Sequence, residues 1–310
     1  MRGPQRCRIC ASARLRTIPG ASDHLTGERF DVVRCGDCGF GVTVPIPGDM
    51  ERFYPSGYRR FGRLASLTLR ALYRARTAGW ASRLGTPGRV LELGAGTGWM
   101  LASLRERGWR ATGTERSVAS AHVARATAGA PVFVGELAAL RQEPLFDLVI
   151  MFHVLEHLAD PQAALAAAAL RLRPGGTLVL GLPNGASWQA QLAGSRWLHL
   201  DVPRHLVHFS VESIRLALEE AGLRVVRVDF RSPEHDPLAW VQLALERLGS
   251  EQGLLLKLLA GLPRRSGRLA AAAALGLAAL LAPFAMAISA TSWIAGRGAV
   301  MEVWAIRDGD

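Results

Sequence analysis

The sequence predicts an α/β protein whose central sheet begins with a nucleotide-binding βαβ unit. Residues 90–98, VLELGAGTG, place a short apolar strand directly before Gly94, Gly96 and Gly98, and apolar residues then recur at helical spacing. From residue 89 to residue 230, apolar runs of strand length alternate with helical patterns, as in a parallel sheet covered by helices. Four cysteines before this region and a long uncharged stretch after it predict a small head and a hydrophobic helical insertion.

The composition is that of a globular chain with room for one large domain and smaller additions. Of the 310 residues, 49% are apolar and 20% are charged, which excludes a disordered protein. The net charge of +11 is compatible with nucleic acid, a nucleotide-linked substrate or a membrane surface as partner. Lys257 is the sole lysine, so a coding bias toward arginine explains the charge at least as well. Residues 1–20 lack the apolar core of a signal peptide, and we expect a cytoplasmic protein.

All four cysteines lie in the first 38 residues, as two Cys-x-x-Cys pairs, Cys7 with Cys10 and Cys35 with Cys38. Two such knuckles at this separation have the spacing of a zinc ribbon, in which four thiolates surround one structural Zn²⁺. Disulfides are disfavoured in the cytosol, and the symmetry of two knuckles disfavours a redox dithiol. We therefore expect a zinc-ribbon-like head over residues 1–45, which is too short to fold without the metal.

Residues 46–88 are expected to connect the head to the sheet. A stretch rich in proline and glycine comes first. From Leu64 to Leu84, apolar residues recur at helical spacing with arginines between them, which predicts a connecting helix.

The core elements follow one another after the glycine turn. Residues 111–115, ATGTE, predict a second strand that ends in an acid roughly 20 residues beyond the glycines, where such folds bind ribose hydroxyls. Ser117 and Gly129 are suited to cap the next helix. Residues 132–134 and the apolar run 146–152 predict the next two strands. The remaining expected elements are a helix capped by Asp160 and Pro161, a turn at 174–176, a strand over 177–182, a helix over 211–221, a strand over 223–230 and a last strand over 299–306. The core is thus expected over residues 89–232, with its last strand and the tail in residues 298–310.

Four motifs occur here in the order and spacing of class I S-adenosylmethionine (SAM)-dependent methyltransferases: VLELGAGTG, the acid Glu115, FHVLEHLADP and LRPGGTLVLGLPN. Over residues 89–230 the chain resembles that family, which implies a Rossmann-like core of seven strands. It looks most like a subgroup with a four-cysteine head, RCGDCGFGVTVPIP followed by YPSGY, and with a PRHLVHFS segment, here residues 203–210. Several members of that subgroup act on nucleotide-linked sugars or on polysaccharide and secondary-metabolite precursors.

The resemblance implies a set of residues that bind SAM. Gly94, Gly96 and Gly98 would line its methionine half, and Glu92 would reach its amino group through water. Glu115 would accept the ribose hydroxyls. The other implied contacts are Glu136 and Leu137 beside the adenine, and Phe152 and His153 beside the sulfonium and the substrate.

The chemistry of these residues agrees with SAM as the ligand. SAM has vicinal ribose hydroxyls for a carboxylate and no pyrophosphate, so it does not need the third glycine of the G-x-G-x-x-G dinucleotide pattern. Trp99 stands at that position here. A nicotinamide-dependent dehydrogenase, the alternative from the same fold class, is therefore disfavoured.

Methyl transfer from a sulfonium is an in-line displacement, so the enzyme has to align the acceptor and, for a hydroxyl, remove its proton. The candidate residues are His153, Glu156 and His157 after the fourth strand, and His205 and His208 in the PRHLVHFS segment. We expect His157 or His205 to be the base and His205, beside Arg204, to contact the acceptor or a phosphate; the pair Glu156 and His157 could equally brace the loop. Ubiquinone-type O-methyltransferases place a Glu-x-x-Glu-His metal site in this loop. His153 replaces its first glutamate, which argues against a catalytic metal, although His153, Glu156 and His157 could still bind one.

Residues 233–297 separate the last two strands and differ from the core. No charged residue occurs between Leu269 and Gly296, a stretch longer than the roughly 20 residues that span a bilayer. A single crossing would leave the last strand on the far side of the membrane. We therefore expect a hairpin bent at Pro283 at the inner membrane surface, a dimer interface or packing within the chain. The region for membrane contact would be residues 264–296, with arginines at both ends.

The sequence thus predicts a SAM-dependent methyltransferase that acts on a small molecule, with a sugar nucleotide, a glycan precursor or a related metabolite as the favoured acceptor. One alternative is an RNA methyltransferase that holds RNA with its ribbon, although the ribbon shows no run of interleaved aromatic and basic residues. Another is a lipid or quinone O-methyltransferase at the membrane surface. A binding protein on an inactive fold is disfavoured by the intact glycines and by Glu115.

Overall fold

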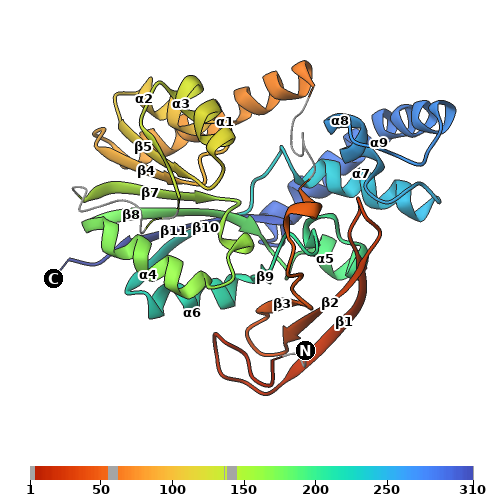
Figure 1. Ribbon diagram of the computed structural model, residues 1–310, viewed down its shortest axis with the longest axis horizontal. Coiled ribbons are helices and arrows are strands. Elements are labelled where there is room, and N and C mark those ends of the chain that lie inside the picture. The colour runs from red at the N-terminus through yellow and green to blue at the C-terminus, as the bar shows by residue number, and fades with distance from the viewer. Residues whose placement is uncertain (1–3, 55–61, 136, 138–144, 310) are drawn as a thin grey trace. The chain divides into compact units, whose positions relative to one another are not determined.

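The computed structural model describes residues 4–54, 62–135, 137 and 145–309. It divides into two compact units (Figure 1). The first comprises Met1–Ser66, Pro183–Ile214 and Asp229–Met301, and the second comprises Leu67–Leu182, Arg215–Val228 and Glu302–Asp310. The residues expected as a head and those expected as an insertion therefore belong to the same unit, the first.

The second unit is built around the seven-stranded sheet that the resemblance implied. Along the sheet the order is β10 (Leu223–Asp229), β11 (Val300–Arg307), β8 (Leu172–Pro183), β7 (Phe146–Phe152), β4 (Arg89–Leu93), β5 (Arg110–Glu115) and β6 (Val132–Val134). The strands β4 and β7 are adjacent and parallel, and β5 and β8 flank them in parallel. The last strand of the chain, β11, lies between β10 and β8, so the chain returns to the sheet after the long insertion, as expected.

Helices cover both faces of this sheet (Figure 1). The helices α2 (Trp99–Arg105) and α3 (Val118–Ala128) lie on one face, and α4 (Pro161–Arg171) and α6 (Val211–Glu220) lie on the other. The predicted caps are confirmed. Ser117 accepts a hydrogen bond from the Ser120 N–H, Gly129 ends α3 in the left-handed conformation, and Asp160 accepts from the Ala163 N–H before Pro161.

The predicted connecting helix, α1 (Arg63–Leu84), is also part of this core. Its Trp80 is fully buried, and the indole N–H donates to Glu302 Oε1 on β11 at 3.0 Å. Arg76 pairs with the other carboxylate oxygen of Glu302 at 2.5 Å. Besides connecting the residues before it to β4, α1 therefore also holds β11 in place through Glu302.

The prediction of a turn between two elements at residues 174–176 is wrong, because these residues lie inside the strand β8, which is longer than expected. The register between β7 and β8 shifts there: Phe146 pairs with Leu172, whereas Leu148 pairs with Thr177. Gly175 takes a φ of +73°, which a residue without Cβ adopts readily. The proline and glycines thus produce a bulge within a strand.

In the first unit, a four-stranded antiparallel sheet forms the head, in the order β1 (Leu15–Ser22), β2 (Arg29–Cys35), β3 (Gly41–Val44) and β9 (Val207–His208). The strand β9 comes from the PRHLVHFS segment. His208 Nε2 lies 2.9 Å from Thr43 Oγ1, and the Ser210 hydroxyl donates to the Cys38 carbonyl at 2.6 Å. The head sheet is therefore completed by residues far along the chain.

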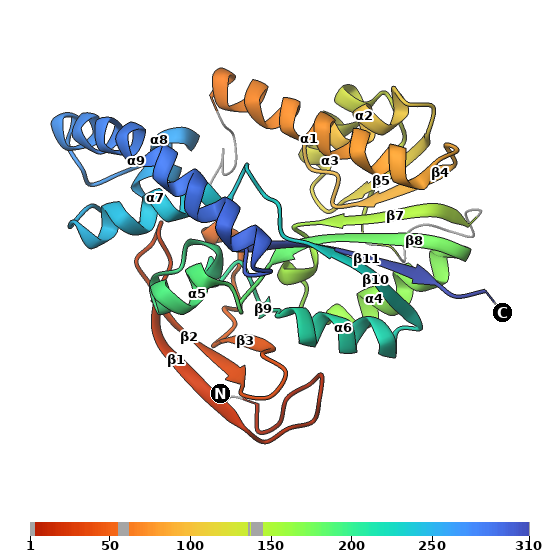
Figure 2. The ribbon, with the colours of Figure 1, turned by 180° about the vertical axis from the view of Figure 1, so that it is seen from behind.

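The helices α5 (Trp188–Ala193), α7 (Asp236–Arg247), α8 (Leu254–Ala260) and α9 (Arg268–Ile294) complete the first unit. The prediction of a hairpin bent at Pro283 is wrong, because α9 continues through that proline, which is exposed. Figure 2 shows α9 as one unbroken helix. Among the described residues, α9 is the one helix long and apolar enough to cross a bilayer. The mean hydropathy of its most apolar 18-residue window is 2.1, and 17% of that window is buried.

Candidate functional site

The glycine turn between β4 and α2 is packed tightly at two positions and open at the third. Gly94, Gly96 and Gly98 all have positive φ, at +66°, +51° and +75°. A Cβ at Gly94 would lie 2.6 Å from Val154 Cγ2, and one at Gly98 would lie 2.6 Å from the Ala124 carbonyl oxygen. A Cβ at Gly96 would meet nothing closer than 3.9 Å. Gly96 therefore faces space that a ligand can occupy.

Two alanine substitutions are expected to separate folding from ligand binding at this turn. Gly98→Ala forces a Cβ into backbone and should lower the free energy of unfolding by a few kcal/mol. Gly96→Ala carries only the left-handed strain, about 1 kcal/mol, but its methyl group fills the open space and should abolish SAM binding. Chemical denaturation and calorimetric titration with SAM measure the two effects. If Gly96→Ala and Gly98→Ala lose the same stability and both still bind SAM, the turn is not open at Gly96 and closed at Gly98 as described.

Two carboxylates lie next to this turn. Glu115, at the end of β5, accepts from the Gly96 N–H through Oε2 at 3.0 Å and from the Arg116 N–H through Oε1 at 2.9 Å. Glu92, on β4, is buried, and within the described residues its Oε2 has no hydrogen-bond partner. Burial raises the pKa of Glu92 to about 8; the Leu101 N–H opposes this shift, and the charge of Glu115 adds to it.

The chemistry of these groups is compatible with the SAM contacts that the resemblance implies for them. A buried carboxyl with one oxygen lacking a partner is a site for an ammonium group such as that of the methionine half. A carboxylate held against the glycine turn is placed for vicinal hydroxyls. The open position at Gly96 lies at the carboxyl end of the parallel strands, where such sheets bind ligands.

His153 directly follows β7, the neighbour of β4, and is held in an unusual conformation. Its φ is +55°, a left-handed value that is uncommon for residues other than glycine and that clusters at functional sites. Its N–H donates to the Gly181 carbonyl at 2.7 Å. Its Nδ1 lies 3.1 Å from Oε1 of the buried Glu156. The structure therefore brings together His153 and Glu156 beside Val154, which contacts the glycine turn.

The other predicted residues of this unit occupy different environments. The Phe152 ring packs against Tyr73, with a centroid distance of 5.9 Å, and also against the fully buried Trp80. Leu137 is buried at 9% exposure, whereas Glu136 lies outside the described residues. His157 ends the short 3₁₀ turn Leu155–His157 and is half-buried.

His205 and Arg204 belong to the first unit, and both are buried. His205 Nδ1 lies 2.9 Å from the His199 carbonyl oxygen. The Arg204 guanidinium is fully buried and donates to Asp23, to Asp201 and to the Phe53 carbonyl. Although burial alone would raise the pKa of Asp201, Arg204 holds it well below its usual range. Arg204 thus joins three segments of the unit as a buried ion and does not present its charge to a phosphate.

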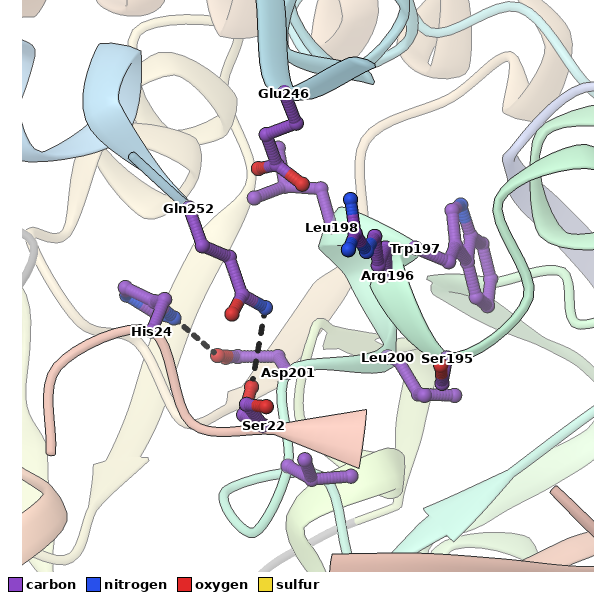
Figure 3. Close-up of a pocket in the computed structure, with 11 residues that line it drawn as sticks. Ser22, His24, Ser195, Arg196, Trp197, Leu198, Leu200, Asp201, Glu246 and Gln252 are labelled. Atoms are coloured by element: carbon purple, nitrogen blue, oxygen red, sulfur yellow. Dashed lines mark hydrogen bonds and ion pairs between the residues drawn. The ribbon is translucent and has the colours of Figure 1, made fainter. Parts of the chain in front are cut away.

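A hollow in the first unit lies next to this ion cluster (Figure 3). His24, Asp201, Glu246 and Gln252 line it, and His24 Nδ1 lies 3.6 Å from Asp201 Oδ1. Its free interior holds little more than a water molecule, which is too little for an acceptor. No local pattern in the sequence indicates this ion cluster, because its members come from distant segments and form no motif.

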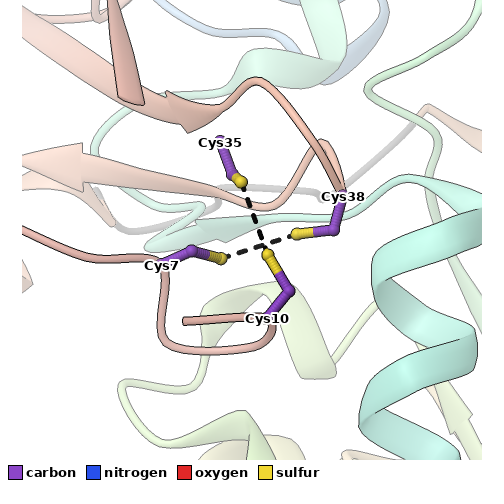
Figure 4. A group of neighbouring side chains, drawn as sticks. All are labelled: Cys7, Cys10, Cys35 and Cys38. Carbon is purple, nitrogen blue, oxygen red and sulfur yellow. Dashed lines mark hydrogen bonds between the residues drawn. The ribbon is translucent and has the colours of Figure 1, made fainter. Parts of the chain in front are cut away.

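The four cysteine thiols converge between the two knuckles of the head (Figure 4). Cys7 Sγ lies 3.5 Å from Cys38 Sγ, Cys10 Sγ lies 3.6 Å from Cys35 Sγ, and all four sulfurs lie within 4.8 Å of one another. Tetrahedral thiolates at a Zn–S distance of about 2.3 Å would be spaced by about 3.8 Å. The cysteines are free thiols, and their arrangement fits a zinc-ribbon-like head.

Comparisons with known proteins identify the domain to which the glycine turn belongs. A family model described as a methyltransferase domain matches residues 57–228. The ubiquinone biosynthesis O-methyltransferase of Alkalilimnicola ehrlichii is 32% identical over 126 residues, which cover 37% of this chain and 51% of that protein. The corresponding protein of Maricaulis maris is 30% identical over 148 residues, covering 44% and 58%. The chain thus spans about half the length of the curated relatives it matches.

Solved structures also match parts of the chain, at lower sequence identity and with TM-scores below 0.5. A SAM-dependent methyltransferase from Thermotoga maritima superposes with a TM-score of 0.47 at 20% identity, covering 78% of this chain and 92% of that protein. The magnesium protoporphyrin IX methyltransferase of Synechocystis superposes with a TM-score of 0.45 at 18% identity, covering 54% and 79%. The family model covers more than half of the chain, and it is this match that decides the assignment.

Proposed function

This chain belongs to the methyltransferase-domain family and is a class I SAM-dependent methyltransferase, and we propose that it methylates a hydroxyl group of a small-molecule acceptor. SAM supplies an electrophilic methyl group on a sulfonium when it is bound. The chain's own residues have to hold that ligand, orient the acceptor and take a proton from its hydroxyl. The observation that supports a hydroxyl acceptor is the pairing of His153 with Glu156 beside the glycine turn.

His153 and Glu156 have the arrangement of a base and the group that orients it. A carboxylate at Nδ1 favours the tautomer with the proton on that nitrogen, which makes Nε2 the basic atom. The left-handed φ of His153 sets the direction in which its side chain leaves the backbone. We therefore propose His153 as the base and Glu156 as its positioning residue. The expectation that His157 or His205 is the base stays a prediction.

The acceptor we favour is a sugar linked to a nucleotide or a related glycan precursor, as the resemblance to the four-cysteine subgroup implies. A second acceptor class, a lipophilic phenol, is supported by the ubiquinone O-methyltransferases among the relatives and by the exposed apolar surface of α9. An activity assay decides between these acceptor classes. It measures the demethylated product of SAM after incubation with nucleoside diphosphate sugars, with short-chain quinols or with bulk RNA. Turnover with RNA alone would refute both proposals.

Substitution of His153 by asparagine tests the proposed base. Asparagine tolerates a left-handed φ, so the backbone should be kept while the basic nitrogen is lost. We expect kcat to fall roughly 10² to 10⁴-fold, with SAM affinity changed little. Glu156→Gln should cause a smaller loss and move the pH profile of kcat. The matched variants His157→Asn and His205→Asn should retain more activity; if His153→Asn turns over normally while one of these does not, the base is misassigned.

We also propose that the cluster of Cys7, Cys10, Cys35 and Cys38 holds one structural Zn²⁺. The sulfur spacing supports this proposal, as does the burial of three of the four cysteines. Four thiolates leave no open position for a substrate, so the metal would stabilise the head and take no part in methyl transfer.

A further inference from the structure

The long helix α9 presents a broad apolar surface, and we propose that it anchors the protein to an anionic bilayer by lying in the plane of the membrane surface. We define the outer face of α9 as its exposed residues from Leu269 to Ile294. This membrane attachment is distinct from methyl transfer and does not depend on which acceptor is used. It is supported by the packing of the helix, by the composition of its outer face and by the charges at its ends.

One side of α9 is already packed within the first unit. Its buried positions include Ala271, Ala274, Ala285, Ser289 and Ser292, which recur at the spacing of one helix face. Val241 and Leu245 of α7, with Leu254 and Leu255 of α8, form an apolar cluster with this face. The helix is therefore held along its inner side by its own unit, and only its outer face is left for a partner.

The outer face of α9 is apolar over its whole length. Leu269 is 89% exposed, Leu280 66%, Phe284 65% and Ile294 90%, and no charged residue lies among them. The exposed hydroxyl of Thr291 is bonded to the Ala287 carbonyl within the helix. A helix at a protein–water boundary normally carries charges on its outer side, so this face is suited to an apolar environment.

The ends of the outer face are basic. Arg264, Arg265 and Arg268 precede it and Arg297 follows it, and all four are exposed. Glu251 lies near the first end, but it pairs with Lys257 and accepts from the Arg265 and Ser266 N–H groups. The negative charge of Glu251 is thus compensated by Lys257 and by these two N–H groups. Arginines at both ends of an apolar face match the phosphates of anionic lipids around a buried helix.

The contacts of α9 favour a position in the membrane plane over a crossing. At its C-terminal end, the Trp293 indole and the Ala299 N–H both donate to Asp236, at the start of α7, at 2.8 and 2.9 Å. The strand β11 then begins at Val300 and joins the core sheet. A crossing helix would have to give up its inner packing and carry the strand across the bilayer. Insertion of the outer face alone requires neither.

Flotation of the full-length protein with vesicles tests the proposal. The probes are vesicles of phosphatidylcholine alone and of phosphatidylcholine with phosphatidylglycerol. We expect the protein to float with the anionic vesicles and more weakly with the neutral ones. Leu280→Glu should weaken flotation by about tenfold or more, because it places a carboxylate in the apolar face. Arg268→Glu should weaken it on anionic vesicles only.

Matched variants elsewhere in the chain serve as controls. Leu170, on α4, is 69% exposed, so Leu170→Glu makes the same chemical change at nearly the same exposure and should float like the wild type. Arg215→Glu on α6 is the control for charge. Absence of flotation, or equal flotation of Leu280→Glu and Leu170→Glu, would overturn the proposal. It would also be overturned if sedimentation shows a dimer that Leu280→Glu dissociates while no variant binds vesicles, since a second copy would then cover this face.

Discussion

Replacement of Cys38 by serine is expected to release one Zn²⁺ per chain and to unfold the head. Cys38 is buried, and its sulfur lies 3.5 Å from that of Cys7 in the cluster of four thiols. Structural zinc contributes roughly 10–16 kcal/mol of binding free energy to small domains at neutral pH, and much of it is lost when one thiolate is removed. This is the largest effect that we expect of any single substitution in this chain.

The loss of zinc from the Cys38→Ser variant should also loosen residues outside the two Cys-x-x-Cys knuckles. The Cys38 carbonyl accepts from the Ser210 hydroxyl, and β3 pairs with β9, so the loss of the metal should also loosen residues 203–210. Metal analysis of the purified protein and hydrogen exchange over the head measure these effects. Ser12→Ala, which alters a hydroxyl bonded to Asp37 near the knuckles, should keep both the zinc and the protection. A wild-type protein without bound metal, or with disulfides in place of thiols, would contradict the assignment.

Replacement of Glu92 by glutamine is expected to stabilise the ligand-free protein while weakening SAM binding. Burial raises the pKa of Glu92 to about 8, above an ordinary value near 4.5, so the folded chain binds this proton more tightly than the unfolded chain. The stabilisation by that proton is fully present below pH 4.5 and is lost as the pH rises through 8. Glutamine cannot ionise, so at pH 8 and above the variant should be more stable by a few kcal/mol.

The same carboxyl should release its proton when SAM binds. The positive amino group of the ligand favours the ionised form of Glu92, so at pH 7 binding should be accompanied by proton release. Calorimetric titration in two buffers of different ionisation enthalpy measures that proton, and Glu92→Gln should release none and bind SAM about tenfold or more weakly. Glu219→Gln, at an exposed position on α6, is the control. If Glu92→Gln binds SAM like the wild type and releases the same proton, Glu92 does not face the ligand.

The core was the part of the fold most accessible to sequence reasoning, because local signals there agree with one another. The run 146–152 has the length and composition of a strand buried on both faces, and β7 occupies those residues. Ser117, Gly129 and Asp160 are caps whose chemistry acts within a few residues. The glycine turn and Glu115 likewise come from adjacent strands, so their meeting follows from the parallel order of the sheet.

The features that sequence reasoning missed depend on contacts between distant segments. Nothing local indicates that His208 would join the head sheet next to Thr43, or that Arg204 would be buried against Asp23. The course of α9 through Pro283 is a second case. A proline within an apolar run predicts a bend, but the lost hydrogen bond is tolerated here because the opposite side of the helix is held by α7 and α8.

Calorimetric titration with SAM and with its demethylated product shows whether the glycine turn and its two carboxylates form a working SAM site. We expect saturable binding of both ligands at one site per chain to the wild type. Gly96→Ala should abolish that binding while keeping most of its stability, because its added methyl group occupies the open side of the turn. Absence of saturable binding to the folded wild type, or undiminished binding by Gly96→Ala, would show that SAM does not bind at this turn.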